Sequence, residues 1–236
     1  MKAAVTPGKI PLSRHMLRRM ASGWALGTAI CLAGCASSAP FNFYTLSNPD
    51  ASTAVTAPVA GARPLQIEVM PTNVPAQVQR PQLVLTTDDG RVAIVEQQRW
   101  SQPLADEISQ GLSQDLTRRL PAIDVYRSPH AADQPLYRIA VNVQRFESAP
   151  GRHTVLEAVW SVTAEPRGLA LTCHTLQTEP VAASGTGIDY PALIDAHRRA
   201  LQYLSGRIAK AIDALSQVPT GHAGESVPLP DCPAGP

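Results

Sequence analysis

Two segments of the chain repeat apolar residues at helical spacing. Between Pro103 and Leu120, a leucine or isoleucine recurs every four residues, at positions 104, 108, 112, 116 and 120. The segment from Pro191 to Leu215 carries a second apolar stripe. Because this spacing places the apolar side chains on one face of a helix, the pattern predicts two amphipathic helices that pack against a common core.

Polar residues at the ends of both segments support these limits. Ser101 is the candidate N-cap of the first helix, and Asp106 and Glu107 fall in its first turn, where the helix dipole favours negative charge. The pair 118–119 places two arginines in its last turn. Asp189 is the candidate N-cap of the second helix.

Other apolar segments are short and mostly alternate with polar residues, as half-buried strands do. The expected strands are 41–46, 65–69, 83–86, 92–95, 123–126, 137–147, 154–164 and 169–176. Asp-Gly at 89–90 predicts a hairpin, because glycine tolerates the positive φ that such a turn requires. Glycine- and proline-containing turns join the last three strands into a predicted antiparallel meander. The expected fold class is α+β, a largely antiparallel sheet with two amphipathic helices packed on one face.

The N-terminal region has the pattern of an export signal. Arginines at positions 14, 18 and 19 precede an apolar run at 21–33, which is too short to span a bilayer. Cys35 follows Leu-Ala-Gly, and these four residues resemble the bacterial lipobox, whose cysteine is acylated before the signal is removed. We therefore expect 1–34 to be a lipoprotein signal peptide and Cys35 to carry lipid. The alternative is an ordinary secretory signal in which Cys35 is a small apolar residue.

Composition divides the rest of the chain. Residues 35–46 are expected to form the lipidated N-terminus and first strand. Residues 47–62, mostly Ala, Pro, Ser and Thr, have the composition of a flexible linker. The α+β domain is then predicted at 63–215, followed by an irregular tail at 216–236 that is rich in Pro and Gly.

The charge balance argues against nucleic acid as a partner. Five of the 20 basic residues precede Cys35, whereas all 19 acidic residues follow it. The chain from Cys35 onward therefore has 15 basic and 19 acidic residues, a formal charge of −4. A phosphate backbone is bound by an excess of positive charge. Membrane attachment is expected to come from the acyl chains, of which a stable anchor needs more than one.

Two cysteines remain after the signal and the lipidation site, namely Cys173 and Cys232. In an oxidising compartment an even pair favours a disulfide, which would attach the tail to the domain. The alternative is one buried thiol and one tail thiol that never meet.

The sequence offers little that resembles catalytic chemistry. Its six histidines are scattered, and Cys173 and His174 should point to opposite faces of a strand, which is poor geometry for a shared metal. His197 fits a core or boundary position on the second helix. Trp100 and Trp160 fit core positions, and 184–187 fits a loop rather than a hydrolase nucleophile elbow. We expect a protein without a catalytic site, metal or cofactor.

Several motifs, taken in order, resemble one known family. The chain is similar to the ABC-type transport auxiliary lipoproteins, which include paraquat-inducible protein C (PqiC). The resemblance extends from Cys35 to about Leu215. The motifs that carry it are Phe-Tyr-Thr-Leu at 43–46, Arg-Pro-Gln-Leu-Val at 80–84, Arg-Trp-Ser-Gln-Pro-Leu at 99–104, Val-Gln-Arg-Phe-Glu at 143–147, and Asp-Tyr at 189–190 before the last helix.

The resemblance implies a subunit of an MCE-type lipid transport system that spans the cell envelope and supports its integrity. The expected location is the outer membrane, with the domain in the periplasm, because Ala36 replaces the aspartate that retains many lipoproteins at the inner membrane. The implied partners are an MCE-domain protein and its inner-membrane partner, and the implied assembly is a homo-oligomeric ring. The first docking candidates are Arg80, Gln82, Arg99 and Trp100, although the same motifs can serve folding alone.

Two other functions fit the anchored domain. An outer-membrane assembly factor would bind a β-barrel partner instead of an MCE protein. An envelope hydrolase would need a catalytic triad or metal cluster, and the sequence displays neither.

Overall fold

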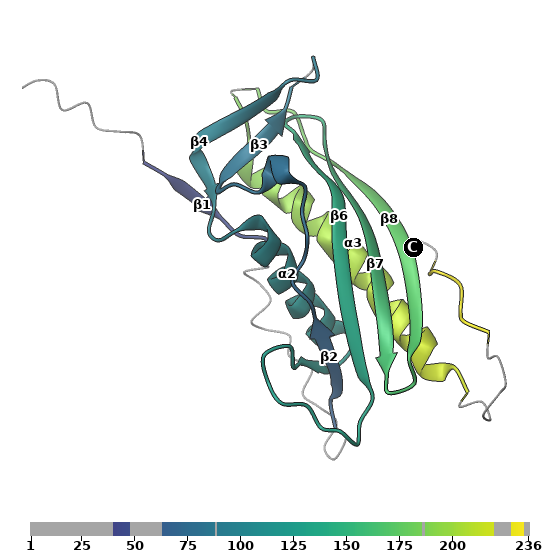
Figure 1. The fold of residues 1–236 in the computed structure, drawn as a ribbon. Coiled ribbons are helices and arrows are strands. Elements are labelled where there is room, and N and C mark those ends of the chain that lie inside the picture. The colour runs from purple at the N-terminus through teal and green to yellow at the C-terminus, as the bar shows by residue number, and fades with distance from the viewer. Residues whose placement is uncertain (1–39, 48–62, 88, 186, 220–227, 234–236) are drawn as a thin grey trace, which may run out of the picture. The chain divides into compact units, whose positions relative to one another are not determined.

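The structure is a computed structural model that describes residues 40–47, 63–87, 89–185, 187–219 and 228–233. The predicted lipidation site Cys35 and nearly all of the predicted linker 47–62 lie outside these ranges. The described elements form two sheets and two α-helices (Figure 1). Their bounds are β1 Asn42–Tyr44, β2 Leu65–Val69, the 3₁₀ turn η3 Ala76–Val78, β3 Gln82–Thr86, β4 Val92–Trp100, α2 Leu104–Arg119, β5 Ala122–Asp124, β6 Leu136–Ala149, β7 His153–Glu165, β8 Leu169–Pro180 and α3 Tyr190–Gln217.

The larger sheet has five strands in the order β5-β2-β6-β7-β8. Strands β6, β7 and β8 pair in antiparallel fashion, so the predicted meander is confirmed. Along β8 the residues alternate between buried and exposed, with Cys173 buried and His174 exposed. One face of the sheet therefore meets the core and the other meets solvent.

The position of β2 was not predicted. This strand lies between β5 and β6 and runs parallel to both. A parallel neighbour requires a crossover connection, and the chain provides one through β3, β4 and α2 before it returns at β5. The sheet is therefore mixed, with its antiparallel part in the meander.

The smaller sheet has three strands in the order β1-β4-β3. The predicted hairpin joins β3 to β4, and Gly90 adopts a φ of +75° in its turn. Strand β1 pairs in parallel with the far end of β4, from Asn42 opposite Gln98 to Tyr44 opposite Trp100. The first strand of the chain is therefore an edge strand beside the last residues of the hairpin.

The two helices begin and end close to the predicted residues. At α3, the Asp189 side chain accepts a hydrogen bond from the Ala192 backbone N–H at 2.9 Å, which confirms the predicted N-cap. At α2 the predicted cap is wrong, because Pro103 occupies the N-cap position. The Ser101 hydroxyl instead donates a hydrogen bond to Glu107 Oε1 at 2.6 Å.

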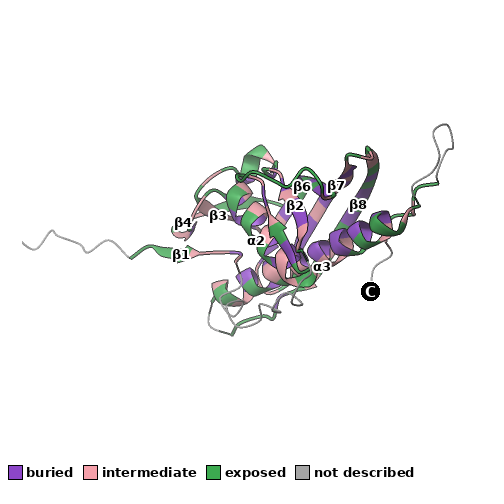
Figure 2. Cartoon of the chain, turned by 90° about the horizontal axis from the view of Figure 1, so that it is seen from below, coloured by how far each residue is buried: buried purple, intermediate pink, exposed green. Residues whose placement is uncertain are grey.

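Both helices bury their apolar stripes against the larger sheet and against each other (Figure 2). Helix α3 packs on β7 and β8, and α2 packs on β2 and β5. Trp160 is buried in this core, where its indole N–H donates a hydrogen bond to Thr175 Oγ1 at 2.8 Å. Within the described residues, neither helix is long and apolar enough to cross a membrane.

Candidate functional site

The segment that follows β1 is bound to α2 by one buried carboxylate. Glu107, in the first turn of α2, is completely buried. Its Oε2 accepts hydrogen bonds from the Thr45 hydroxyl and the Leu46 backbone N–H, both at 2.7 Å. Its Oε1 accepts the bond from the Ser101 hydroxyl. We call these four residues the Glu107 cluster.

Helix α3 also holds the same segment. Arg198 on α3 donates a hydrogen bond from Nη2 to the Thr45 carbonyl oxygen at 2.7 Å. The Leu46 side chain is buried in the core that both helices share. On β1 itself, the Tyr44 hydroxyl donates to Gln98 Oε1 on β4 at 2.7 Å. Strand β1 is therefore fixed to the rest of the fold although it lies at a sheet edge.

A groove of about 670 Å³ opens beside β1 and the start of α2. It combines apolar side chains with two arginines, Arg80 and Arg99, and its lining includes no aspartate or glutamate. The lining residues are Phe43, Thr72, Asn73, Val74, Gln79, Arg80, Pro81, Arg99, Trp100, Ser101, Gln102, Pro103, Leu104 and Ala105. A groove of this composition suits an anionic group that carries an apolar portion.

Local contacts position both arginines of the groove. Arg80 Nε donates to the carbonyl oxygen of Gln77 in η3 at 3.1 Å. The Arg99 guanidinium lies over the ring of Phe41, 4.2 Å from its centroid, a cation–π arrangement. Arg99 also approaches Glu96, with 3.8 Å between Nη2 and Oε2. Because this distance is long and Glu96 is exposed, the ion pair leaves Arg99 able to bind a second anion.

Three of the four predicted docking residues, Arg80, Arg99 and Trp100, line this groove. Trp100 is only 4% exposed and packs edge-on against Phe146 and His197, as predicted for a core aromatic. Gln82 is not a lining residue. Its side chain donates to Glu96 Oε2 at 3.0 Å on the outward face of the hairpin.

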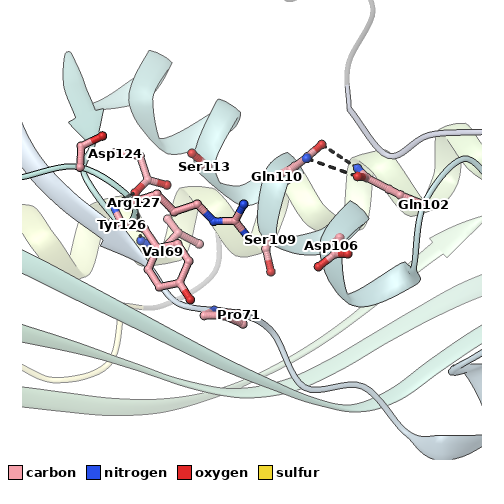
Figure 3. Close-up of a pocket in the computed structure, with 11 residues that line it drawn as sticks. Val69, Pro71, Gln102, Asp106, Ser109, Gln110, Ser113, Asp124, Tyr126 and Arg127 are labelled. Atoms are coloured by element: carbon pink, nitrogen blue, oxygen red, sulfur yellow. Dashed lines mark hydrogen bonds between the residues drawn. The ribbon is translucent and has the colours of Figure 1, made fainter.

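A second, more polar groove of about 450 Å³ lies between α2 and the chain that follows β5 (Figure 3). Arg127 reaches across it toward Ser109 of α2. Two carboxylates, Asp106 and Asp124, also line it. These two negative charges exceed the single positive charge of Arg127, so this groove is a poorer site for an anion than the groove beside β1.

His197 occupies the core position that the sequence predicted. Its ring stacks on Phe146, with 4.0 Å between centroids, and its Nε2 lies 2.8 Å from the Ser148 hydroxyl. Complete burial lowers the pKa of His197 to about 3, so the imidazole is neutral at physiological pH. A Ser–His pair without solvent access serves packing and not nucleophilic catalysis.

The structure also bears on the chemistry of the cysteines and of the other metal-ligating residue types. The structure joins Cys173 on β8 to Cys232 in the tail by a disulfide. Among the described residues, no group of three or more His, Cys, Asp or Glu side chains has the geometry to hold a metal ion.

The sequence pattern does not predict the Glu107 cluster, because the helix dipole alone accounts for a glutamate at this position. Thr45 and Ser101, at two separate points before α2, were its only sequence signal.

Comparison with known proteins identifies a family. The family described as the ABC-type transport auxiliary lipoprotein component matches residues 44–209. This range includes the Glu107 cluster and every residue that lines the groove except Phe43. No curated protein matches the chain.

Comparison with solved structures gives matches of low sequence identity. The crystal structure of an uncharacterized protein has a TM-score of 0.56 and 17% identity, and the match covers 74% of this chain and 99% of that one. A protein from Xanthomonas campestris, of family DUF330, matches with a TM-score of 0.42 and 16% identity over 61% of this chain and 80% of that one. The PelC dodecamer from Paraburkholderia phytofirmans matches with a TM-score of 0.30 and 10% identity, over 70% and 91% of the two chains.

Proposed function

Because this chain belongs to the ABC-type transport auxiliary lipoproteins, we propose that it is the outer-membrane lipoprotein subunit of an MCE-type lipid transport system. In this role it docks to the MCE-domain protein that spans the periplasm and that meets an inner-membrane partner at its other end. The match over residues 44–209 carries the proposal. The protein acts by position and by contact, without catalysis.

The proposed anchor is an acylated Cys35, exposed as the first residue once 1–34 have been removed. The fold already begins at β1, since Thr45 and Leu46 are bound to Glu107. The tether between lipid and fold is therefore short, and residues 47–62 connect two parts of the fold without lengthening that tether. The periplasm is an oxidising compartment, so we propose that the Cys173–Cys232 bond is present in the cell.

The proposed docking face for the MCE protein is the outward side of the β3–β4 hairpin. Gln82 and Val84 alternate along β3 with buried leucines and lie on the other side of the strand, where both are partly buried. Val92 and Ile94 pair with β3 on the same side and are exposed, at 54% and 46%. Exposed apolar residues with a polar rim are typical of protein interfaces. In the proposed homo-oligomeric ring, each copy presents one such face.

The test is a gentle detergent purification of the tagged, lipidated protein from its native membrane, with partners identified by mass spectrometry. We expect an MCE-domain protein and its inner-membrane partner. The variant Val92→Ser with Ile94→Ser should recover much less of both. Leu176→Ser, at an exposed apolar position on β8, is the matched control. Recovery of an outer-membrane barrel, or of no partner, would overturn the proposal.

A further inference from the structure

We propose that Phe41, Phe43, Arg80 and Arg99, here called the β1 face, contact the phospholipid surface in which the Cys35 acyl chains are anchored. The inference rests on the proposed lipidation of Cys35. It adds a second contact with the membrane, made by the folded protein itself. The partner is a phospholipid leaflet that contains anionic lipid.

Exposed aromatic rings are the first observation. The whole chain has three phenylalanines, and Phe41 and Phe43 are 50% and 64% exposed. They are two residues apart, so both side chains leave the same side of the extended chain at β1. Aromatic rings are favoured at the boundary between lipid headgroups and hydrocarbon. Contact with a bilayer would remove this apolar surface from water.

Positive charge beside the rings is the second observation. Arg99 lies over the Phe41 ring, and Arg80 lines the same groove as Phe43. The chain from Cys35 onward is acidic overall, yet no carboxylate lines this groove. Guanidinium groups bind phosphate through paired charge-assisted hydrogen bonds. The combination of two arginines and two phenylalanines therefore suits phospholipid headgroups.

Chain length supplies the third observation. Phe41 is the sixth residue after Cys35, and six residues span at most about 20 Å when fully extended. The bonds to Thr45 and Leu46 fix the next residues to α2 and α3. With the acyl chains of Cys35 in the bilayer, the β1 face cannot move far from the membrane surface.

The opposite end of the same sheet remains available for a protein partner. Val92 lies eight residues before Trp100 along β4, a distance of about 25 Å in an extended strand. The hairpin end would therefore project away from the lipid while the β1 face contacts it. Membrane contact and protein docking do not compete for the same residues.

Site-specific photocrosslinking tests the contact in the full lipidated protein. A photoreactive phenylalanine analogue replaces Phe43 in one strain and Leu176, at an exposed site on β8, in the other. After irradiation of intact cells, we expect the Phe43 probe to add the mass of one phospholipid and the Leu176 probe to add none. A protein adduct at position 43, or no adduct there, would overturn the proposal.

A double variant tests whether the two arginines of the β1 face cause the lipid adduct. Combining Arg80→Gln with Arg99→Gln should reduce the adduct at position 43 severalfold, whereas Arg63→Gln, at an exposed arginine outside the β1 face, should leave it unchanged. An unchanged adduct in the double variant would remove the arginines from the proposal.

The premise of the proposal is the lipidation of Cys35. Mass spectrometry that shows an N-terminal peptide without acylated Cys35 would overturn this premise. A lipid adduct in cells that yield no MCE partner would retain the membrane contact and reject only the proposed function.

Discussion

The carboxylate of Glu107 accepts a hydrogen bond from the Leu46 backbone N–H at 2.7 Å, although 61 residues separate the two in sequence. This bond joins the segment after β1 to the first turn of α2. It also gives the buried Leu46 N–H, which has no partner in a neighbouring strand, a hydrogen-bond acceptor. Residues 42–46 are thus part of the fold and not a free extension.

Replacing Glu107 should destabilise the whole fold. Glu107→Ala leaves the Thr45 hydroxyl, the Leu46 N–H and the Ser101 hydroxyl without their acceptor, and we expect a loss of about 3 kcal/mol in the free energy of unfolding. Urea unfolding followed by circular dichroism measures this loss. Asp106→Ala, at an exposed residue in the same turn, is the control and should change little. Equal effects of the two substitutions would contradict the role of the cluster.

His197 should make the fold sensitive to acid. Its folded pKa of about 3 lies below the ordinary value of 6.5, so the unfolded chain binds one more proton between these two values. The free energy of unfolding therefore falls as the pH falls through this window, by about 2 kcal/mol from pH 7 to pH 5. The His197→Leu variant should be less stable at pH 7. Its free energy of unfolding should lack the part of the pH dependence that His197 causes. Parallel pH profiles for the two proteins would exclude His197 as the cause.

Gly111 allows the two helices to approach closely. A Cβ added at Gly111 would lie 2.5 Å from Leu201 Cδ2, inside contact distance. Gly111→Ala should therefore destabilise the fold by roughly 1–2 kcal/mol, despite the better helix propensity of alanine. In a Leu201→Ala background the same change should be neutral or stabilising, because the clash is gone. A double-mutant cycle by thermal or urea unfolding measures the coupling.

The disulfide should stabilise the fold through the tail. Cys173 and Cys232 are 59 residues apart, and closing a loop of that length is worth about 4 kcal/mol in the chain-entropy model. Cys232→Ser should lower the unfolding midpoint in non-reducing buffer. A reducing agent should lower the midpoint of the natural protein to a similar value and leave that of the variant unchanged. A midpoint insensitive to reduction in the natural protein would contradict this contribution.

Local pattern was sufficient for the meander and for both helices. Alternation along β6, β7 and β8 predicts which side chains are buried, and short turns leave antiparallel pairing as the simplest connection. Asp189 at the start of α3 is likewise a local signal, because its partner Ala192 is three residues away. In these elements the physical cause and the sequence pattern lie within a few residues.

Parallel neighbours and the Glu107 cluster depend on contacts between distant segments. Alternation in β2 predicts a half-buried strand but does not reveal that β5 and β6 flank it. A glutamate in a first helical turn is fully explained by the helix dipole, so its burial under Thr45 could not be inferred. Serine favours the N-cap position, which is why the sequence predicts Ser101 as a cap. In the structure its hydroxyl donates instead to the charged carboxylate of Glu107, a stronger acceptor.

The attachment of Thr45 determines how the protein would carry a mechanical load. A pull on the residues before Phe41 would reach the fold through β1, Thr45 and Leu46, which are bonded to α2 and α3. The force would then be shared by two helices and would not begin by peeling a hairpin from the sheet edge. A subunit fixed to a membrane at one end and to a long partner at the other could transmit tension between them while its core remains folded.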